Sequence, residues 1–381
     1  MLLRGSTMPP TDWKTKYQHK IRDPRSALRN LRPGERIFIG SGCAVPSLLI
    51  QTLEKIGSRL SDTEIMHILT VGDTPYTNAQ FSDNFRCNTF FIGKNTRTAI
   101  AEGRADYTPV FLSDLPHLFR SGHIPIDLAL IQVTPPDARG FCSFGISVDV
   151  VKSAAESAKT VIAEVNPQMP RTLGDSLISI DSIETLVEHD TPIPEMPLPP
   201  LDEISMRIAQ NVSRLIADES TIQMGIGTIP AAITECLKDK KDLGVHSEMV
   251  SDGVVDLWKK GILTNKKKNL HRGKMITTFC MGTKKLYDFV NNNPFIEFHP
   301  SEYVNDPSVI RLNDKMVAIN SALEVDLTGQ VRQNRWVIFS TVESAARQIL
   351  CGDPLNLKEE NLSSHSPQQR KTKLFPASSP T

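Results

Sequence analysis

Short apolar runs alternate with segments of helical periodicity along most of this chain of 381 residues. The run at residues 36–40 is followed by residues 45–60, in which leucine and isoleucine recur every three or four positions. Further runs with strand character lie at residues 65–71, 89–92, 126–133, 160–165, 221–224, 243–245, 275–279 and 316–319. Because parallel strands need a crossover between them, usually a helix, this alternation predicts an α/β fold with mostly parallel sheets.

A proline-rich stretch divides the pattern into two halves. Residues 191–200 contain five prolines, and proline lacks the amide hydrogen that a helix or a strand ladder needs. The sequence therefore predicts two tandem α/β domains joined by a linker. The predicted parts are a short leader (1–12), an N-terminal domain (13–195), the linker (196–204), a C-terminal domain (205–330) and a tail (331–381).

The second domain begins with a helical pattern. Ile204, Ile208, Val212 and Leu215 are spaced three or four residues apart. Residues at this spacing share one face of a helix, so these four are predicted to form one helical face.

Glu248 follows the short apolar run 243–245 almost directly. A residue at the carboxyl end of a parallel strand faces the crevice where α/β proteins bind ligands, although a loop glutamate is usually a solvated surface group. A carboxylate with an ordinary pKa near 4.3 is ionised at neutral pH and needs no base to act as a nucleophile. His246 could be a general base, but an orienting or packing role is preferred, since an ionised carboxylate has no proton to give up.

A glycine-x-glycine turn precedes Glu248 by one strand–helix unit. Gln223 and Met224 end an apolar run, Gly225 and Gly227 follow, and a helical pattern begins at residue 228. Backbone amides at a helix N-terminus suit an anion, although such a turn by itself usually marks only a tight bend.

Several other segments belong with these two motifs. They are residues 40–46, 133–145, 166–172, 303–307 and 319–330. Taken in order, they resemble the class I CoA-transferases of the acetyl-CoA hydrolase/transferase family, in the branch of the 4-hydroxybutyrate and acetate:succinate CoA-transferases. The resemblance covers residues from about 13 to 330.

The resemblance implies a function and a set of site residues. It implies that Glu248 is the nucleophile, which carries coenzyme A as a glutamyl thioester, and that Asn305 supplies a side-chain amide to the oxyanion hole. Gln223, Gly225 and Gly227 are then expected at the CoA-binding site. The expected reaction moves CoA between a short-chain acyl-CoA and a carboxylate such as acetate or succinate, with no metal or redox cofactor; the rival reaction is acyl-CoA hydrolysis.

Composition limits the other partners. The 43 basic and 43 acidic residues balance, which gives no global attraction to nucleic acid or to an anionic membrane. No apolar stretch approaches the roughly 18 residues of a membrane span. The six cysteines form no C-x-x-C pair and the nine histidines no H-x-x-x-H pattern, so buried, reduced cysteines and no metal site are expected.

Location and assembly are predicted from weaker signals. No secretory signal is expected, and the leader has one arginine and no acid before Asp12, which favours a mitochondrial over a cytoplasmic location. The resemblance implies a homodimer if the chain is intact.

The resemblance stops after Gln330. The family continues with a glycine-rich segment of the form Y-x-G-x-G-G-x-x-D-F. This chain instead continues with an unrelated sequence, which is polar and aperiodic from Gly352. A shifted reading frame explains the change, so residues 331–381 are predicted to be an out-of-frame tail, partly disordered and with few contacts to the rest. The second domain is then incomplete, which leaves an inactive remnant or CoA-binding pseudoenzyme as a further alternative.

Overall fold

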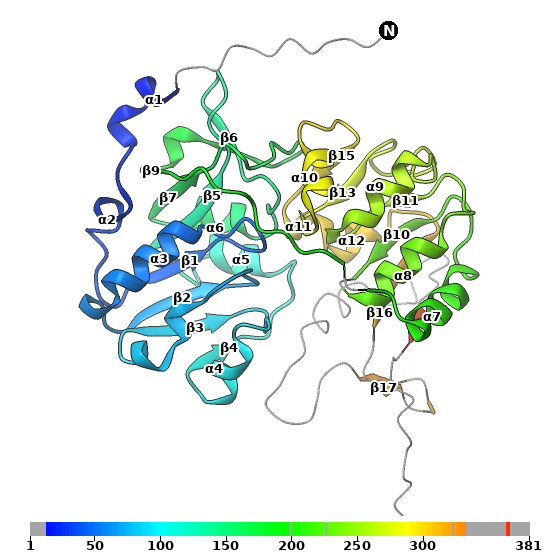
Figure 1. The fold of residues 1–381 in the computed structure, drawn as a ribbon, viewed down its shortest axis with the longest axis horizontal. Helices are drawn as coiled ribbons and strands as arrows, with labels where there is room; N and C mark the ends of the chain where they lie inside the picture. The colour runs from blue at the N-terminus through cyan, green and yellow to red at the C-terminus, as the bar shows by residue number, and fades with distance from the viewer. Residues whose placement is uncertain are drawn as a thin grey trace, which may run out of the picture.

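In the computed structural model the chain forms two lobes that lie side by side (Figure 1). The structure describes residues 13–198, 200–225, 227–321, 324–325, 327–328, 330–332 and 363–365. Within these residues, none of the helices has both the length and the apolar character that a bilayer span requires.

The first lobe is built on one seven-stranded sheet in which every pairing is parallel. Its strands, in sheet order, are β4 (Ala105–Tyr107), β3 (Phe85–Thr89), β2 (Thr63–His67), β1 (Arg36–Ile39), β5 (Leu128–Val133), β7 (Thr160–Val165) and β9 (Thr185–Glu188). The other elements are α1 (Trp13–Lys16), α2 (Pro24–Ala27), α3 (Ser47–Ile56), α4 (Arg97–Ala101), α5 (Leu115–Arg120), α6 (Val151–Ser157) and an antiparallel pair, β6 (Phe141–Ser143) with β8 (Leu177–Ser179). Short 3-10 turns lie at Gln18–Lys20, Gly57–Arg59, Pro75–Thr77, Ala79–Phe81 and Ile180–Ser182.

Both faces of this sheet are covered. Phe38 of β1 packs into one buried cluster, while its neighbours Ile37 and Ile39 pack into another on the opposite side. Successive side chains of a strand point to opposite faces, so continuous apolar runs such as β5 are what a parallel sheet with two covered faces requires. The predicted α/β class is confirmed.

The second lobe holds a parallel sheet in the order β11-β10-β16-β19 and two parallel pairs, β12 with β14 and β13 with β15. The strands are β10 (Thr221–Met224), β11 (Gly244–Val245), β12 (Met249–Val250), β13 (Met275–Thr277), β14 (Phe279–Cys280), β15 (Ile296–Phe298), β16 (Met316–Ser321), β17 (Glu324–Val325), β18 (Val331–Arg332) and β19 (Ser363–His365). The helices are α7 (Glu203–Ser213), α8 (Thr228–Cys236), α9 (Asp252–Lys259), α10 (Lys284–Val290), α11 (Ser301–Val304) and α12 (Pro307–Ile310).

Only part of the predicted helical face of α7 is buried. Ile204 and Leu215 are 60% and 53% exposed, whereas Val212 and the small residues Ser205 and Ala209 are buried. α7 packs against α8, and small side chains let two helix backbones approach closely. The two ends of the predicted helical face are therefore exposed, because close packing against α8 buries a different stripe.

The segment between β9 and α7 lies along α10 and contains no helix or strand among its described residues. Met196 N donates to Gly282 O at 2.8 Å, and Tyr287 Oη donates to Pro194 O at 2.7 Å. α7 begins at Glu203, where the Asp202 carboxylate accepts a hydrogen bond from the Ser205 amide, so the last two residues of the predicted linker are helical. The predicted domain boundaries otherwise stay predictions.

Little of the predicted tail is described. β18 pairs antiparallel with β17, and β19 pairs parallel with β16 from Ile319 opposite Ser363 to Ser321 opposite His365. Residues 363–365 therefore contact the second lobe, where few contacts were predicted. The rest of the tail and the leader lie outside the described residues.

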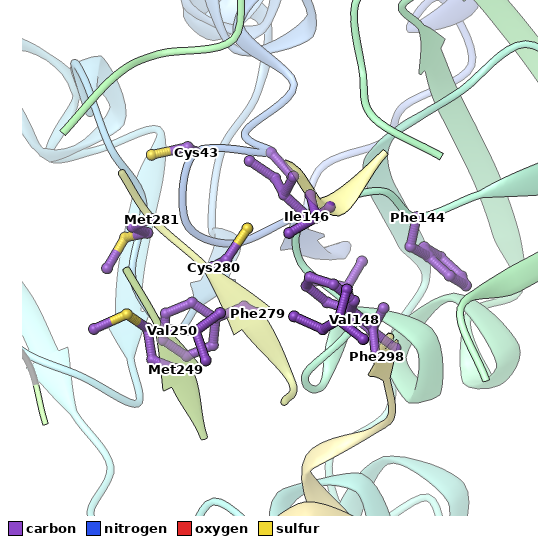
Figure 2. Close-up of a cluster of buried hydrophobic side chains, with 14 of the residues drawn as sticks. Cys43, Phe144, Ile146, Val148, Met249, Val250, Phe279, Cys280, Met281 and Phe298 are labelled. Atoms are coloured by element: carbon purple, nitrogen blue, oxygen red, sulfur yellow. The ribbon is translucent and has the colours of Figure 1, made fainter. Parts of the chain in front are cut away.

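The two lobes share one buried cluster, which Figure 2 shows in close-up. Its labelled members are Cys43, Phe144, Ile146 and Val148 from the first lobe and Met249, Val250, Phe279, Cys280, Met281 and Phe298 from the second. Backbone hydrogen bonds cross the same boundary, from Cys280 N to Ile146 O at 2.9 Å and from Val148 N to Thr278 O at 3.0 Å. Apolar packing and backbone pairing together fix the position of one lobe on the other.

The cysteines within the described residues are unpaired, as predicted. Cys43, Cys87, Cys142 and Cys280 are buried, and Cys236 is partly buried. Burial raises the pKa of the Cys43 thiol to about 11, because a thiolate is poorly solvated in an apolar setting.

Candidate active site

The backbone of Glu248 is held firmly on the loop between β11 and β12. Its carbonyl oxygen accepts hydrogen bonds from the amides of Thr278 and Phe279, at 3.0 and 3.2 Å. The hydroxyls of Thr277 and Thr278 donate to the same oxygen at 3.0 and 2.9 Å. Because these donors belong to the segment that contacts the first lobe, Glu248 is fixed at the boundary between the lobes.

Asn305 is brought to Glu248 across 57 residues of sequence, and its Nδ2 donates to Glu248 Oε2 at 2.6 Å. Asn305 is buried at the end of α11, where its amide donates to Ser301 O at 2.9 Å. The Nε2 of His246 lies 2.9 Å from Val304 O, one residue before Asn305. The Asn305 side-chain amide is thus held by α11, and His246, two residues before Glu248, ties the end of α11 to the loop that carries the carboxylate.

Burial changes the acidity of Glu248. Desolvation disfavours the charged carboxylate and raises its pKa to about 7; the Asn305 hydrogen bond acts in the opposite direction, and the nearby charge of Asp149 raises the pKa further. The sequence-based expectation of full ionisation at neutral pH was therefore wrong. The pKa of about 7 leaves about half of the Glu248 side chains ionised at that pH.

His246 is too deeply buried to be an effective base. It is 1% exposed, and burial together with the charge of Lys268 lowers its imidazole pKa to about 3. A neutral imidazole that donates from Nε2 to the carbonyl oxygen of Val304 orients the end of α11 relative to the loop of Glu248. This geometry supports the orienting role over the general-base alternative.

Asp149, from the first lobe, is a site residue that the sequence reasoning missed. Its buried carboxylate accepts hydrogen bonds from the hydroxyls of Ser41 and Ser147, at 2.5 and 2.7 Å. Its own amide donates to Thr278 O at 3.2 Å, and its carbonyl oxygen accepts from Ser301 N at 3.0 Å. Asp149 therefore joins the first lobe to the segment around Thr278, which hydrogen-bonds to the Glu248 backbone, and to α11, which ends directly before Asn305. The S-x-D spacing that follows the resembling segment 133–145 was the available signal.

The glycine-x-glycine turn only partly matches its predicted role. Met224 N lies 3.2 Å from Ser247 Oγ, so the end of β10 adjoins the residue before Glu248. The amide of Gly225, however, donates to Ile319 O at 3.1 Å and is committed to the sheet. Gly227 is exposed with a φ of +126°, and a Cβ there would meet no atom within 4 Å, which leaves room for a ligand.

The side chain of Gln223 is hydrogen-bonded within its own sheet. It is 2% exposed in β10, and its Oε1 accepts a hydrogen bond from Asn320 Nδ2 at 3.2 Å. Its side chain pairs β10 with β16, so a direct contact with CoA stays a prediction.

Replacing Glu248 with glutamine is expected to stabilise the protein at alkaline pH. A folded-state pKa raised from 4.5 to about 7 means that folding opposes ionisation; this cost develops as the pH rises from about 4.5 to about 7 and is complete above that. Glu248→Gln should match the parent near pH 4 and exceed its unfolding free energy by about 3 kcal/mol near pH 8. Urea unfolding at both pH values measures this difference, and equal stabilities at the higher pH would contradict the raised pKa.

Two family profiles match the chain. The acetyl-CoA hydrolase/transferase N-terminal domain matches residues 7–197, and the C-terminal domain of the same family matches residues 282–343. The second match extends past Gln330, where the resemblance in the sequence was predicted to end.

Relatives and solved structures agree with these profiles. The 4-hydroxybutyrate coenzyme A transferase of Clostridium kluyveri is 48% identical over 320 residues, which are 84% of this chain and 75% of the relative. The succinyl-CoA:acetate/propanoyl-CoA:succinate CoA transferase of Fasciola hepatica is 46% identical over 304 residues, 79% of this chain and 63% of the relative. The crystal structure of a 4-hydroxybutyrate CoA-transferase from Porphyromonas gingivalis is 39% identical in sequence. Its superposition covers 84% of this chain and 77% of the crystallised chain, with a TM-score of 0.75. The chain therefore belongs to the acetyl-CoA hydrolase/transferase family.

Proposed function

We propose that this chain transfers coenzyme A from a short-chain acyl-CoA to a carboxylate such as acetate or succinate. The observation that carries the proposal is the Glu248 carboxylate, which is partly buried and lies 2.6 Å from the Asn305 amide. The CoA-transferase names of the relatives described above support the same reaction class.

The reaction proceeds through covalent intermediates on Glu248. The carboxylate attacks the acyl-CoA thioester carbonyl, the C–S bond breaks, and an acyl–glutamyl anhydride and CoA thiolate form. The thiolate then attacks the glutamyl carbonyl, which releases the acyl group as a carboxylate and leaves a glutamyl–CoA thioester. The acceptor carboxylate takes CoA through the same steps in reverse, so no net proton is consumed.

Asn305 would stabilise the negative charge that develops on the oxyanion in each step. Its Nδ2 contacts the reacting carboxylate and would donate to the tetrahedral oxyanion, an interaction that is typically the largest single contribution to catalysis. Its buried Oδ1 has no partner among the described residues, and a polar hydrogen of the substrate would satisfy this acceptor. The exposed turn at Gly227 offers a place for a ligand next to α8.

Hydrolysis is the alternative outcome for the same intermediate. A transferase must exclude water from the glutamyl thioester, whereas a hydrolase admits it. In one assay, acyl-CoA is mixed with an isotope-labelled carboxylate acceptor, and the rate at which label appears in acyl-CoA is measured. In a second assay without acceptor, the rate of release of free CoA is measured, and the two rates are compared. Transfer requires ping-pong kinetics and slow release without acceptor; equally fast release with and without acceptor would assign hydrolysis instead.

The assay should include a second protein, because the tail is predicted to be out of frame. In a chimera, the residues after Gln330 are replaced by the corresponding segment of the Clostridium kluyveri relative. Activity in the chimera alone identifies this chain as an inactive remnant with a competent Glu248 site. Absence of transfer in both proteins contradicts the proposed function.

The homodimer and the mitochondrial location stay predictions. Light scattering of the purified chain during gel filtration measures the first. Imaging of a fusion that retains residues 1–12 measures the second.

A further inference from the structure

Two histidines and a glutamate converge in the second lobe next to α11. The ligand atoms of His271, Glu297 and His299 all lie within 4.8 Å of one another, and each residue is partly buried. The three come from the loop before β13, from β15 and from the residue after β15. None of them belongs to the CoA-transfer chemistry proposed above.

We propose that His271, Glu297 and His299 form a binding site for a divalent transition-metal ion such as Zn²⁺. Glu297 Oε2 lies 3.2 Å from His299 Nε2 and 3.7 Å from His271 Nδ1. Zinc binds imidazole nitrogen and carboxylate oxygen at about 2.0–2.1 Å, so ligand atoms of a tetrahedral site stand about 3.4 Å apart. The observed spacings require only small side-chain movements, and water would complete the fourth position.

The ligand set identifies the class of ion. Two imidazoles with one carboxylate suit Zn²⁺ and its neighbours in the first transition row, whereas Mg²⁺ and Ca²⁺ prefer oxygen ligands throughout. The partial exposure of the three side chains leaves a path for the ion from solvent.

Outer contacts already orient the ligands. His271 Nε2 lies 2.6 Å from Tyr303 Oη, which leaves Nδ1 facing Glu297. Metal-bound imidazoles usually have such a partner on the second nitrogen, and its loss typically weakens binding by about 10–100-fold. Lys274 Nζ lies 3.3 Å from Glu297 Oε1 and occupies the carboxylate oxygen that the imidazoles do not use.

A bound ion would restrain α11 through the contact of His271 with Tyr303. Tyr303 lies on α11, whose next residue, Val304, contacts His246, and Asn305 follows directly. A metal bound to His271 and to the β15 ligands would therefore restrain the segment that presents Asn305 to Glu248. This gives the site a structural role that is separate from the transfer chemistry.

The sequence patterns that indicate metal sites do not include this arrangement. Glu297 and His299 are two residues apart in extended backbone, so their side chains share a face, but His271 is supplied by a distant loop. The contrary interpretation is that the cluster is only an ion-pair network, in which Lys274 pairs with Glu297 and His299 lies within hydrogen-bond distance of the same carboxylate. The two interpretations differ in whether a metal binds.

The test uses the purified 381-residue chain, freed of metal with a chelator and then incubated with Zn²⁺. After gel filtration the chain should retain one equivalent of zinc, and Co²⁺ in its place should give the intense visible absorption of a tetrahedral site. His271→Ala, Glu297→Gln and His299→Ala should each lose the bound metal, while His123→Ala, an exposed histidine of the first lobe, should retain it.

Two further variants separate a metal site from an ion-pair network. Lys274→Gln removes a competing cation and should tighten zinc binding, and Tyr303→Phe should weaken it by about 10–100-fold. Glu297→Gln is nearly isosteric, so its circular dichroism spectrum should match that of the parent and confirm an intact fold. No zinc in the parent, an octahedral Co²⁺ spectrum, or unchanged binding in the three ligand variants would overturn the proposal.

Discussion

Glu248→Gln is expected to reduce CoA transfer by about 10⁴-fold or more, because the proposed mechanism places the CoA thioester on this carboxylate; losses of this size follow removal of a catalytic nucleophile. The amide of glutamine is nearly isosteric with the carboxylate but cannot form the anhydride or the CoA thioester. The fold should survive, since the hydrogen bonds that fix this loop are made by the Glu248 backbone.

The measurement is the initial rate of label transfer, in the chain or in the chimera if only the chimera is active. Glu203→Gln, an exposed glutamate in the first turn of α7, is the matched control and should transfer CoA at the parent rate. Incubation with acyl-CoA and then hydroxylamine or borohydride should modify Glu248 in the parent, as located by mass spectrometry. A label on another residue, or ping-pong transfer by Glu248→Gln, would show that the nucleophile has been misassigned.

Asn305→Ala is expected to lower the rate by about 10²–10³-fold, the typical effect of removing one oxyanion-hole donor. The same change alters the pH dependence. The Asn305 hydrogen bond lowers the pKa of Glu248, so its removal should move that pKa further above about 7. Activity should rise with pH in both proteins as Glu248 ionises, and the rising limb of kcat/KM should lie at higher pH in the variant.

Asn211→Ala, at an exposed position of α7, provides the matched control and should leave both the rate and the pH profile unchanged. Thermal unfolding of Asn305→Ala checks that α11 remains folded. A rate loss with an unshifted pH profile would mean that Asn305 only holds the backbone and does not act on the Glu248 carboxylate.

The sequence by itself determined the fold class and much of the strand pattern. The predicted runs at Thr160–Val165 and Thr221–Met224 are strands with those bounds, and the alternation of runs and helical patterns is realised as parallel sheets in both lobes. Local periodicity carries this information, because a buried parallel strand must be apolar along its whole length. Glu248 and Asn305 were identified through the family motifs, and the structure places them in contact.

Only the tertiary structure decided the environment of those residues. The pKa of Glu248 depends on desolvation and on Asp149, which the other lobe supplies. The Gly225 amide is committed to Ile319, a partner nearly a hundred residues away. The buried stripe of α7 was selected by α8, against its own apolar periodicity. In each case the deciding interaction joins residues that are distant in sequence, and burial and charge act through space, so a local pattern does not contain them.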